Sequence, residues 1–110
     1  MPKSKQVKSG KITQKGPEGY SVEGDMTFDT VRTLLQESKG LFTAGSNVKL
    51  NLSEVQQADS AGLALLLEWI AQARKAGVEV SVDGVPDSLK AIARLCRMED
   101  ELDDFVAPKR

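Results

Sequence analysis

The residues best suited to chemistry lie in one short segment, Asp59-Ser60-Ala61-Gly62-Leu63. A serine nucleophile needs a neighbouring base, and histidine, the commonest one, is absent from all 110 residues. No spacing singles out a lysine as a substitute base. We therefore predict that the chain is not an enzyme and that it has no catalytic residue.

The other common chemistries also lack their residues. With one cysteine and no histidine, the chain has no partner for an internal disulfide and too few ligands for a thiolate metal cluster. It shows no paired carboxylates at catalytic spacing and no glycine-rich phosphate loop. We interpret the acidic residues near position 100 as a solvated tail. No metal site and no cofactor are expected.

Asp59 and Ser60 precede an apolar run, where either side chain can cap a helix by accepting hydrogen bonds from its first backbone N–H groups. Negative charge at an exposed helix N-terminus is favoured by about 0.3–1 kcal/mol, so the fold would tolerate a phosphate on Ser60. That phosphate would add about two charges and could switch binding. Ser60 is thus a possible phospho-acceptor, and a purely structural cap is the alternative.

The helix after this segment carries two apolar sets when it is projected at about 100° per residue. The core stripe consists of Leu63, Leu66, Leu67 and Ile70, with Ala73 at its edge. Leu65 and Trp69 lie off that stripe, so they either tuck beneath a neighbouring element or form an exposed patch for a partner. We favour the patch because it adjoins Ser60. The expected partner-binding residues are Asp59, Ser60, Ala61, Gly62, Leu65 and Trp69.

The elements that must position these residues follow from periodicity and turn signals. Alternating apolar residues predict strands near 10–15, 20–23, 48–52 and 78–82, and helical spacing predicts helices near 27–40, 60–76 and 86–96. Thr27 is the expected N-cap of the first helix, Cys96 is expected to be buried in the last, and the acidic tail can add a short helical turn. Because apolar and polar residues alternate along the clear strands, one face of the sheet should be exposed to solvent. The prediction is an α/β fold, β-β-α-β-α-β-α, with a small mixed sheet and helices mainly on one face.

Length and charge indicate how many domains the chain forms and which partners to expect. A chain of 110 residues with 40% hydrophobic side chains fits a single domain, which we place at 10–110, after a flexible basic arm at 1–9. The net charge of -1 gives no reason to expect nucleic acid. No run approaches the roughly 20 apolar residues of a membrane span. A cytoplasmic protein that meets a membrane only through a partner is expected.

The segment Asp59-Ser60-Ala61-Gly62-Leu63 resembles the signature of STAS domains, the fold of sulfate-transporter tails and anti-sigma-factor antagonists. Residues 24–27 match the start of that family's first helix, and residues 48–52 match its central strand. Within the family, residues 62–67 and 76–85 are similar to MlaB-like subunits of the bacterial Mla phospholipid-transport ABC system. The resemblance covers most of the chain and implies a STAS-type fold.

The MlaB-like resemblance implies a non-enzymatic subunit that binds the MlaF-like ATPase of an ABC transporter, and contacts the permease indirectly. Such a subunit supports assembly and activity of a transporter that maintains outer-membrane lipid asymmetry, and it lies peripherally at the inner membrane. The resemblance places Ser60 in the ATPase contact. Two alternatives remain: an anti-sigma-factor antagonist regulated by phosphorylation of Ser60, and a homodimer formed through Trp69.

Overall fold

Four strands and four helices build the part of the chain that the computed structural model describes, residues 10–42 and 47–103. The elements are β1 (Gly10–Gln14), β2 (Gly19–Met26), α1 (Val31–Glu37), β3 (Asn47–Ala58), α2 (Ser60–Ala76), β4 (Glu79–Asp83), α3 (Asp87–Leu95) and α4 (Glu99–Asp103). This order confirms the predicted sequence of elements, including the extra helical turn in the acidic tail. The basic arm at 1–9 lies outside the described residues.

The strands form one mixed sheet in the order β1-β2-β3-β4. β1 and β2 pair antiparallel as a hairpin, while β2 with β3 and β3 with β4 pair parallel. Helix α1 lies between β2 and β3 along the chain, and α2 lies between β3 and β4. Each helix forms the crossover connection that joins two parallel strands. Because the parallel strands share a direction, the loops that follow β2, β3 and β4 all emerge at one end of the sheet.

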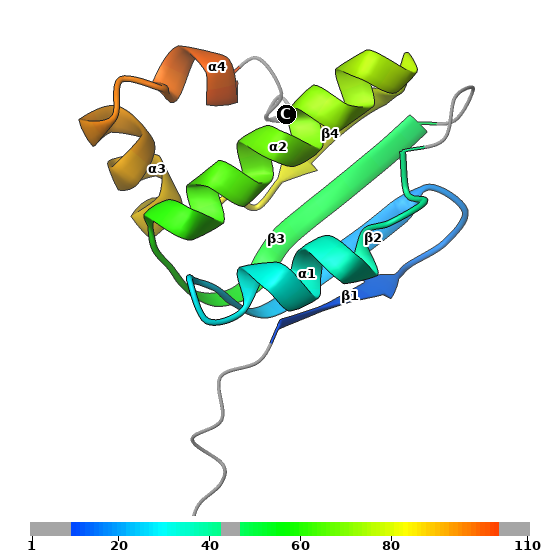
Figure 1. The fold of residues 1–110 in the computed structure, drawn as a ribbon, viewed down its shortest axis with the longest axis horizontal. Helices are drawn as coiled ribbons and strands as arrows, with labels where there is room; N and C mark the ends of the chain where they lie inside the picture. Colours follow the sequence, from blue (N-terminus) through cyan, green and yellow to red (C-terminus); the bar gives the residue numbers. More distant parts are fainter. Residues whose placement is uncertain (1–9, 43–46, 104–110) are drawn as a thin grey trace, which may run out of the picture.

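One face of the sheet is covered and the other is open, as the alternation predicts. In β3, Val48, Leu50 and Leu52 are buried, while Lys49 and Asn51 between them are exposed. Figure 1 shows α1 and α2 lying on the same side of the sheet, with α3 beside α2. The mixed sheet with helices on one face is therefore confirmed.

β3 is longer than predicted, because it runs to Ala58 instead of ending near residue 52. Its pairing with β2 shifts register between Ser21 and Glu23 and again between Gly24 and Asp25. Each irregularity changes which side chains face the core, so the strict alternation that marks residues 48–52 is lost beyond them. The extension places Asp59 directly after the last residue paired with β2.

The predicted cap of the first helix is wrong by three residues. α1 begins at Val31 with Thr30 in the N-cap position, and Thr27 lies in a preceding turn whose carbonyl accepts from the backbone N–H groups of Thr30 and Val31. The Thr30 hydroxyl accepts from Thr27 N at 3.0 Å and donates to the Asp25 carbonyl at 2.7 Å. Phe28 therefore precedes the helix instead of belonging to its apolar stripe.

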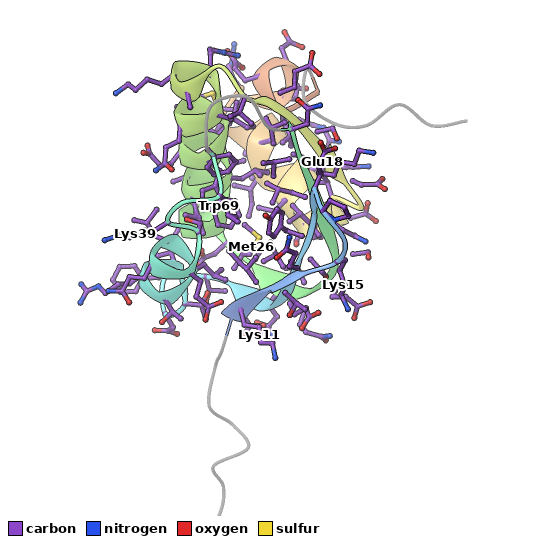
Figure 2. The ribbon with its side chains drawn as sticks, turned by 90° about the vertical axis from the view of Figure 1, so that its right-hand side faces the viewer. Lys11, Lys15, Glu18, Met26, Lys39 and Trp69 are labelled. Carbon is purple, nitrogen blue, oxygen red and sulfur yellow. The ribbon has the colours of Figure 1, made fainter. Side chains whose placement is uncertain are left out.

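Leu65 and Trp69 are interior residues, which corrects the prediction that they form a surface patch. Leu65 is 5% exposed and Trp69 is 0% exposed. α2 contacts α1 and α3 as well as β2, β3 and β4, so a much broader arc of its surface is covered than one stripe. Figure 2 shows Trp69 and Met26 inside the molecule, whereas Lys11, Lys15 and Lys39 point outward.

Cys96 is exposed, and the prediction that it is buried is also wrong. α3 ends at Leu95, so Cys96 is the C-cap and no longer continues the helical stripe that buries Leu89 and Ala93. Arg97 follows with a φ of 59°, in the left-handed region, and turns the chain toward α4.

Helix α1 also contacts the edge strand β1. β1 is an edge strand, and the backbone N–H of Ile12 donates to Oε1 of Glu37, in the last turn of α1, at 2.7 Å. An outward-facing strand N–H is a group to which another chain can pair. Here a side chain of the same molecule satisfies it.

Candidate functional site

Asp59 organises the end of the sheet at which the loops after β2 and β3 meet. It is the N-cap of α2, in extended conformation, and its Oδ1 accepts from Ala61 N at 2.9 Å and from Gly62 N at 3.2 Å. These bonds satisfy two of the backbone donors that a helix N-terminus leaves unpaired. The predicted cap at Asp59 is confirmed, and the helix it caps is 17 residues long.

The second carboxylate oxygen of Asp59 reaches a different loop. Oδ2 accepts from the backbone N–H of Phe28 at 3.1 Å, and the backbone N–H of Asp59 donates to the Met26 carbonyl at 3.2 Å. One aspartate thus ties the β2–α1 loop to the start of α2. We call the group of Phe28, Asp59, Ser60, Ala61 and Gly62 the Asp59 corner.

Gly62 is required by this close approach. A Cβ built on Gly62 would collide with the Met26 carbonyl oxygen and would lie 2.9 Å from the Met26 Cβ. Gly62 itself is buried. The glycine in the first helical turn, which costs up to about 1 kcal/mol relative to alanine, is explained by backbone packing.

The corner presents a hydroxyl and an aromatic ring to solvent. Ser60 is exposed at the first position of α2, Ala61 is half-buried, and Ala64, one turn further, is exposed. Phe28 is 79% exposed, although its backbone is fixed by Asp59. The exposed large apolar side chain of the Asp59 corner is therefore Phe28, and not the Leu65–Trp69 pair that the sequence suggested.

Sequence reasoning missed Phe28 because its spacing to Val31, Leu34 and Leu35 fits a buried helical stripe. Of these four residues only Leu34 is buried. The turn at 27–30 moves Phe28 off the helix, and no local sequence signal distinguishes that turn from a first helical turn. The bond to Asp59, 31 residues away, is a tertiary contact.

The corner holds no recognisable reactive set. Within residues 10–42 and 47–103, no group of three or more His, Cys, Asp or Glu residues could hold a metal ion. Among the same residues, no helix has the length and apolar content to cross a bilayer. What the arrangement offers is a rigid, mixed polar and apolar contact surface.

The family is established by comparison with known proteins. A family model described as "Mlab, STAS domain" matches residues 16–106, so the chain belongs to the STAS domain family. STAS domains occur in transporters and in anti-sigma-factor antagonists, and they generally regulate or bind other proteins. No curated protein gives a significant sequence match.

Solved structures share the fold. A sulfate transporter family protein from Wolinella succinogenes superposes with a TM-score of 0.62 at 22% identity, over 87% of this chain and 80% of that one. A murine anion transporter of the solute carrier 26 family, in its inward-facing state, gives 0.56 at 14% identity over 83% of this chain. The match spans only 19% of that transporter, so it concerns one domain of a larger protein.

Proposed function

We propose that this chain is a non-enzymatic STAS subunit that binds the MlaF-like ATPase of an ABC transporter for intermembrane phospholipid transport. Its binding supports assembly and activity of the transporter, and through it outer-membrane lipid asymmetry. The subunit is cytoplasmic and reaches the inner membrane and the permease through that ATPase. The name of the matching family model, which refers to MlaB, supports this choice among STAS functions.

The observation that carries the proposal is the exposed Phe28 ring, whose backbone N–H is bonded to the same Asp59 carboxylate that caps the helix beginning at the exposed Ser60. Aromatic side chains are enriched among the residues that dominate binding energy. Because the backbone around the ring is already fixed, a partner would bind it with little loss of conformational entropy. The Asp59 corner thus has the composition and the rigidity of a docking site.

Phe28 and Ser60 are tested by co-expressing the chain with its MlaF-like ATPase and measuring co-purification. Phe28→Ala and Ser60→Asp are each expected to reduce the bound fraction at least about tenfold, the effect of one hot-spot residue. Leu95→Ala is the matched control, because Leu95 is 84% exposed on α3. Full retention of both Phe28→Ala and Ser60→Asp would overturn the assignment of the site.

A phosphorylation-regulated anti-sigma-factor antagonist is the second candidate, favoured by the exposure of Ser60 at the start of α2. The hydroxyl is accessible to a kinase, and the helix N-terminus stabilises added negative charge. Incubation with a cognate anti-sigma kinase, followed by intact-mass measurement, separates the two functions. A Ser60-dependent phosphate on this chain, without ATPase binding, would favour the antagonist.

A further inference from the structure

The basic arm at 1–9 holds a concentration of charge that the Asp59 corner does not account for. Lys3, Lys5 and Lys8 lie in it, and it contains no acidic residue. The whole chain has a net charge of -1 and the arm contributes three positive charges, so the other residues together carry a net charge of -4. Positive charge is therefore gathered in one short segment of an otherwise acidic chain.

The basic arm joins the sheet at the end where the Asp59 corner lies. β1 runs antiparallel to β2, and its first residue, Gly10, pairs with Gly24 near the end of β2. The loop after β2 contains Phe28, and β3, which is parallel to β2, ends directly before Asp59. Figure 1 shows β1 beginning at the end of the sheet where β2 and β3 finish.

Gly10 packs directly against the turn that carries Phe28. A Cβ built on Gly10 would lie 2.8 Å from the Asp25 carbonyl oxygen, which accepts from the Thr30 hydroxyl at 2.7 Å. The same hydroxyl accepts from the backbone N–H of Thr27, the residue before Phe28, at 3.0 Å. The point from which the arm departs is thus connected to the corner through a short series of contacts.

The length of the arm limits how far its lysines can be from that point. An extended chain covers at most about 3.6 Å per residue, so the Cα of Lys8 can be no more than about 7 Å from that of Gly10, and the Cα of Lys3 no more than about 25 Å. A protein docked on Phe28 therefore lies within reach of the arm.

The described residues around the start of β1 carry charges of both signs. Lys11, the second residue of β1, and Arg32, in the first turn of α1, are exposed. Asp29 is exposed in the turn before α1, Asp25 is half-buried, and Glu37 is already bonded to β1. With the three lysines of the arm added, positive charge outweighs negative charge on this side of the corner.

We propose that the basic arm binds an acidic surface of the protein that docks at the Asp59 corner. This inference rests on the proposed function, in which that protein is the ATPase. The arm supplies long-range attraction that speeds association, while Phe28 and Ser60 supply the short-range contact. Anionic lipid is disfavoured as the occupant, because lipid-binding clusters hold about 4–8 basic residues next to an apolar anchor, whereas the arm has three lysines and no aromatic residue.

Stopped-flow association of the full chain with the MlaF-like ATPase tests the arm. The triple variant Lys3→Gln, Lys5→Gln, Lys8→Gln is expected to slow association about tenfold at low salt and to leave the dissociation rate almost unchanged. At about 0.5 M salt the difference from the unmodified chain should shrink to less than about twofold, because exposed charges are then screened.

A second triple variant is the matched control, because it removes the same charge at the opposite end of the sheet. Its changes are Lys15→Gln, Lys49→Gln and Lys75→Gln, at exposed positions after β1, near the start of β3 and near the end of α2. Association should slow by less than about twofold at any salt concentration.

A titration with a hexaglutamate peptide tests the arm without the ATPase. In NMR spectra of the full chain, the amide signals of Lys8 and Phe28 are expected to shift, and that of Lys75 is not. A hexalysine peptide should shift none of the three. Vesicles of phosphatidylcholine and phosphatidylglycerol, tested in parallel, are expected not to retain the chain at about 0.15 M salt.

Equal slowing by the two triple variants would overturn the proposal. So would faster association of the arm variant, which would show that the arm covers acidic residues of its own domain, or retention on the vesicles that the arm variant loses. Normal association of the arm variant would end this proposal and leave the proposed function intact. If the unmodified chain does not bind the ATPase, the proposed function fails, and the hexaglutamate titration alone decides whether the arm binds acidic protein surfaces.

Discussion

Two surfaces of this small domain each expose one large apolar side chain, but the fold holds them very differently. At the Asp59 corner, one carboxylate bonds to Phe28, Ala61 and Gly62, and a glycine is forced by the Met26 backbone. At the C-terminal end of α3, Leu95 is the last residue of its helix, and the left-handed Arg97 and the short acidic helix α4 come after it. The corner is held by contacts distant in sequence, whereas the position of Leu95 follows from where α3 ends.

The two surfaces differ in how firmly the fold positions the exposed apolar residue. The backbone of Phe28 is bonded to Asp59, which precedes Ser60, before any partner arrives, and this suits recognition of one particular surface. Leu95 is exposed between Arg94 and Cys96, which are also exposed, and its position depends on the local end of α3. Variants can therefore be chosen that disturb the Asp59 corner while leaving the end of α3 unchanged, and the expected losses of stability differ in size.

The largest effect is expected from filling the contact beneath the corner. Gly62→Val would force the start of α2 away from Met26, and overpacking of this kind costs about 3 kcal/mol of unfolding free energy. Ala64→Val is the matched control, because the same side chain is added to the same helix at an exposed position. It should cost about 0.5 kcal/mol. Urea denaturation measures both, and similar losses would contradict the close approach at Gly62.

A smaller effect is expected from changing one oxygen of Asp59. In Asp59→Asn, the remaining oxygen can still accept from Ala61 and Gly62, but the amide N–H₂ would face the Phe28 N–H, donor against donor. We expect a loss of about 1 kcal/mol. Hydrogen exchange should accelerate at the Phe28 amide and much less at the Ala61 amide. Equal acceleration at both would show that the carboxylate does not divide its bonds as described.

Trp69 provides a still smaller effect, away from both surfaces. Its indole N–H is buried and has no hydrogen-bond partner among the described residues. Trp69→Phe loses packing but removes the unsatisfied donor, and these terms of about 1–3 kcal/mol each oppose one another. A net change within about 1 kcal/mol is expected by thermal denaturation. Tryptophan fluorescence of the unmodified chain should resist acrylamide, and free quenching would contradict the burial of Trp69.

The smallest effect on stability is expected from the two exposed side chains themselves. Phe28→Ala and Leu95→Ala should each change the unfolding free energy by no more than about 0.5 kcal/mol, because neither ring nor leucine is part of the core. A loss above about 2 kcal/mol for Phe28→Ala would show that the ring packs within the domain. In that case the corner would have no free aromatic contact to offer.

The sequence predicted most of the fold because strand alternation, turn residues and glycine stops are local signals. One covered sheet face was predicted from the alternation of Val48, Leu50 and Leu52, which are buried. The end of α2 was predicted from Gly77, which adopts the left-handed conformation at φ 74°. The same reasoning found Asp59 as a candidate cap of the helix that follows it. These features depend on residues within a few positions of one another.

The outward apolar residues could not be predicted in this way. Whether Trp69 is covered depends on the elements that pack around α2, and whether Phe28 is free depends on a turn held by Thr30 and Asp59. A helical projection gives the angle of a side chain, but not the number of neighbours around the helix. The projection therefore favoured an exposed Trp69 and counted Phe28 in a helical apolar stripe, whereas the structure buries Trp69 and exposes Phe28.

The bond between Glu37 and the Ile12 amide has a consequence for how this chain behaves when it is crowded. A sheet grows when a further strand pairs with one of its edge strands. When this pairing repeats between molecules, it produces fibrils. At the β1 edge, the Glu37 carboxylate already accepts from the Ile12 N–H. At the β4 edge, the short strand carries Glu79 and Asp83, whose charges would repel a second copy of β4. Both features hinder the addition of a further strand at an edge of the sheet.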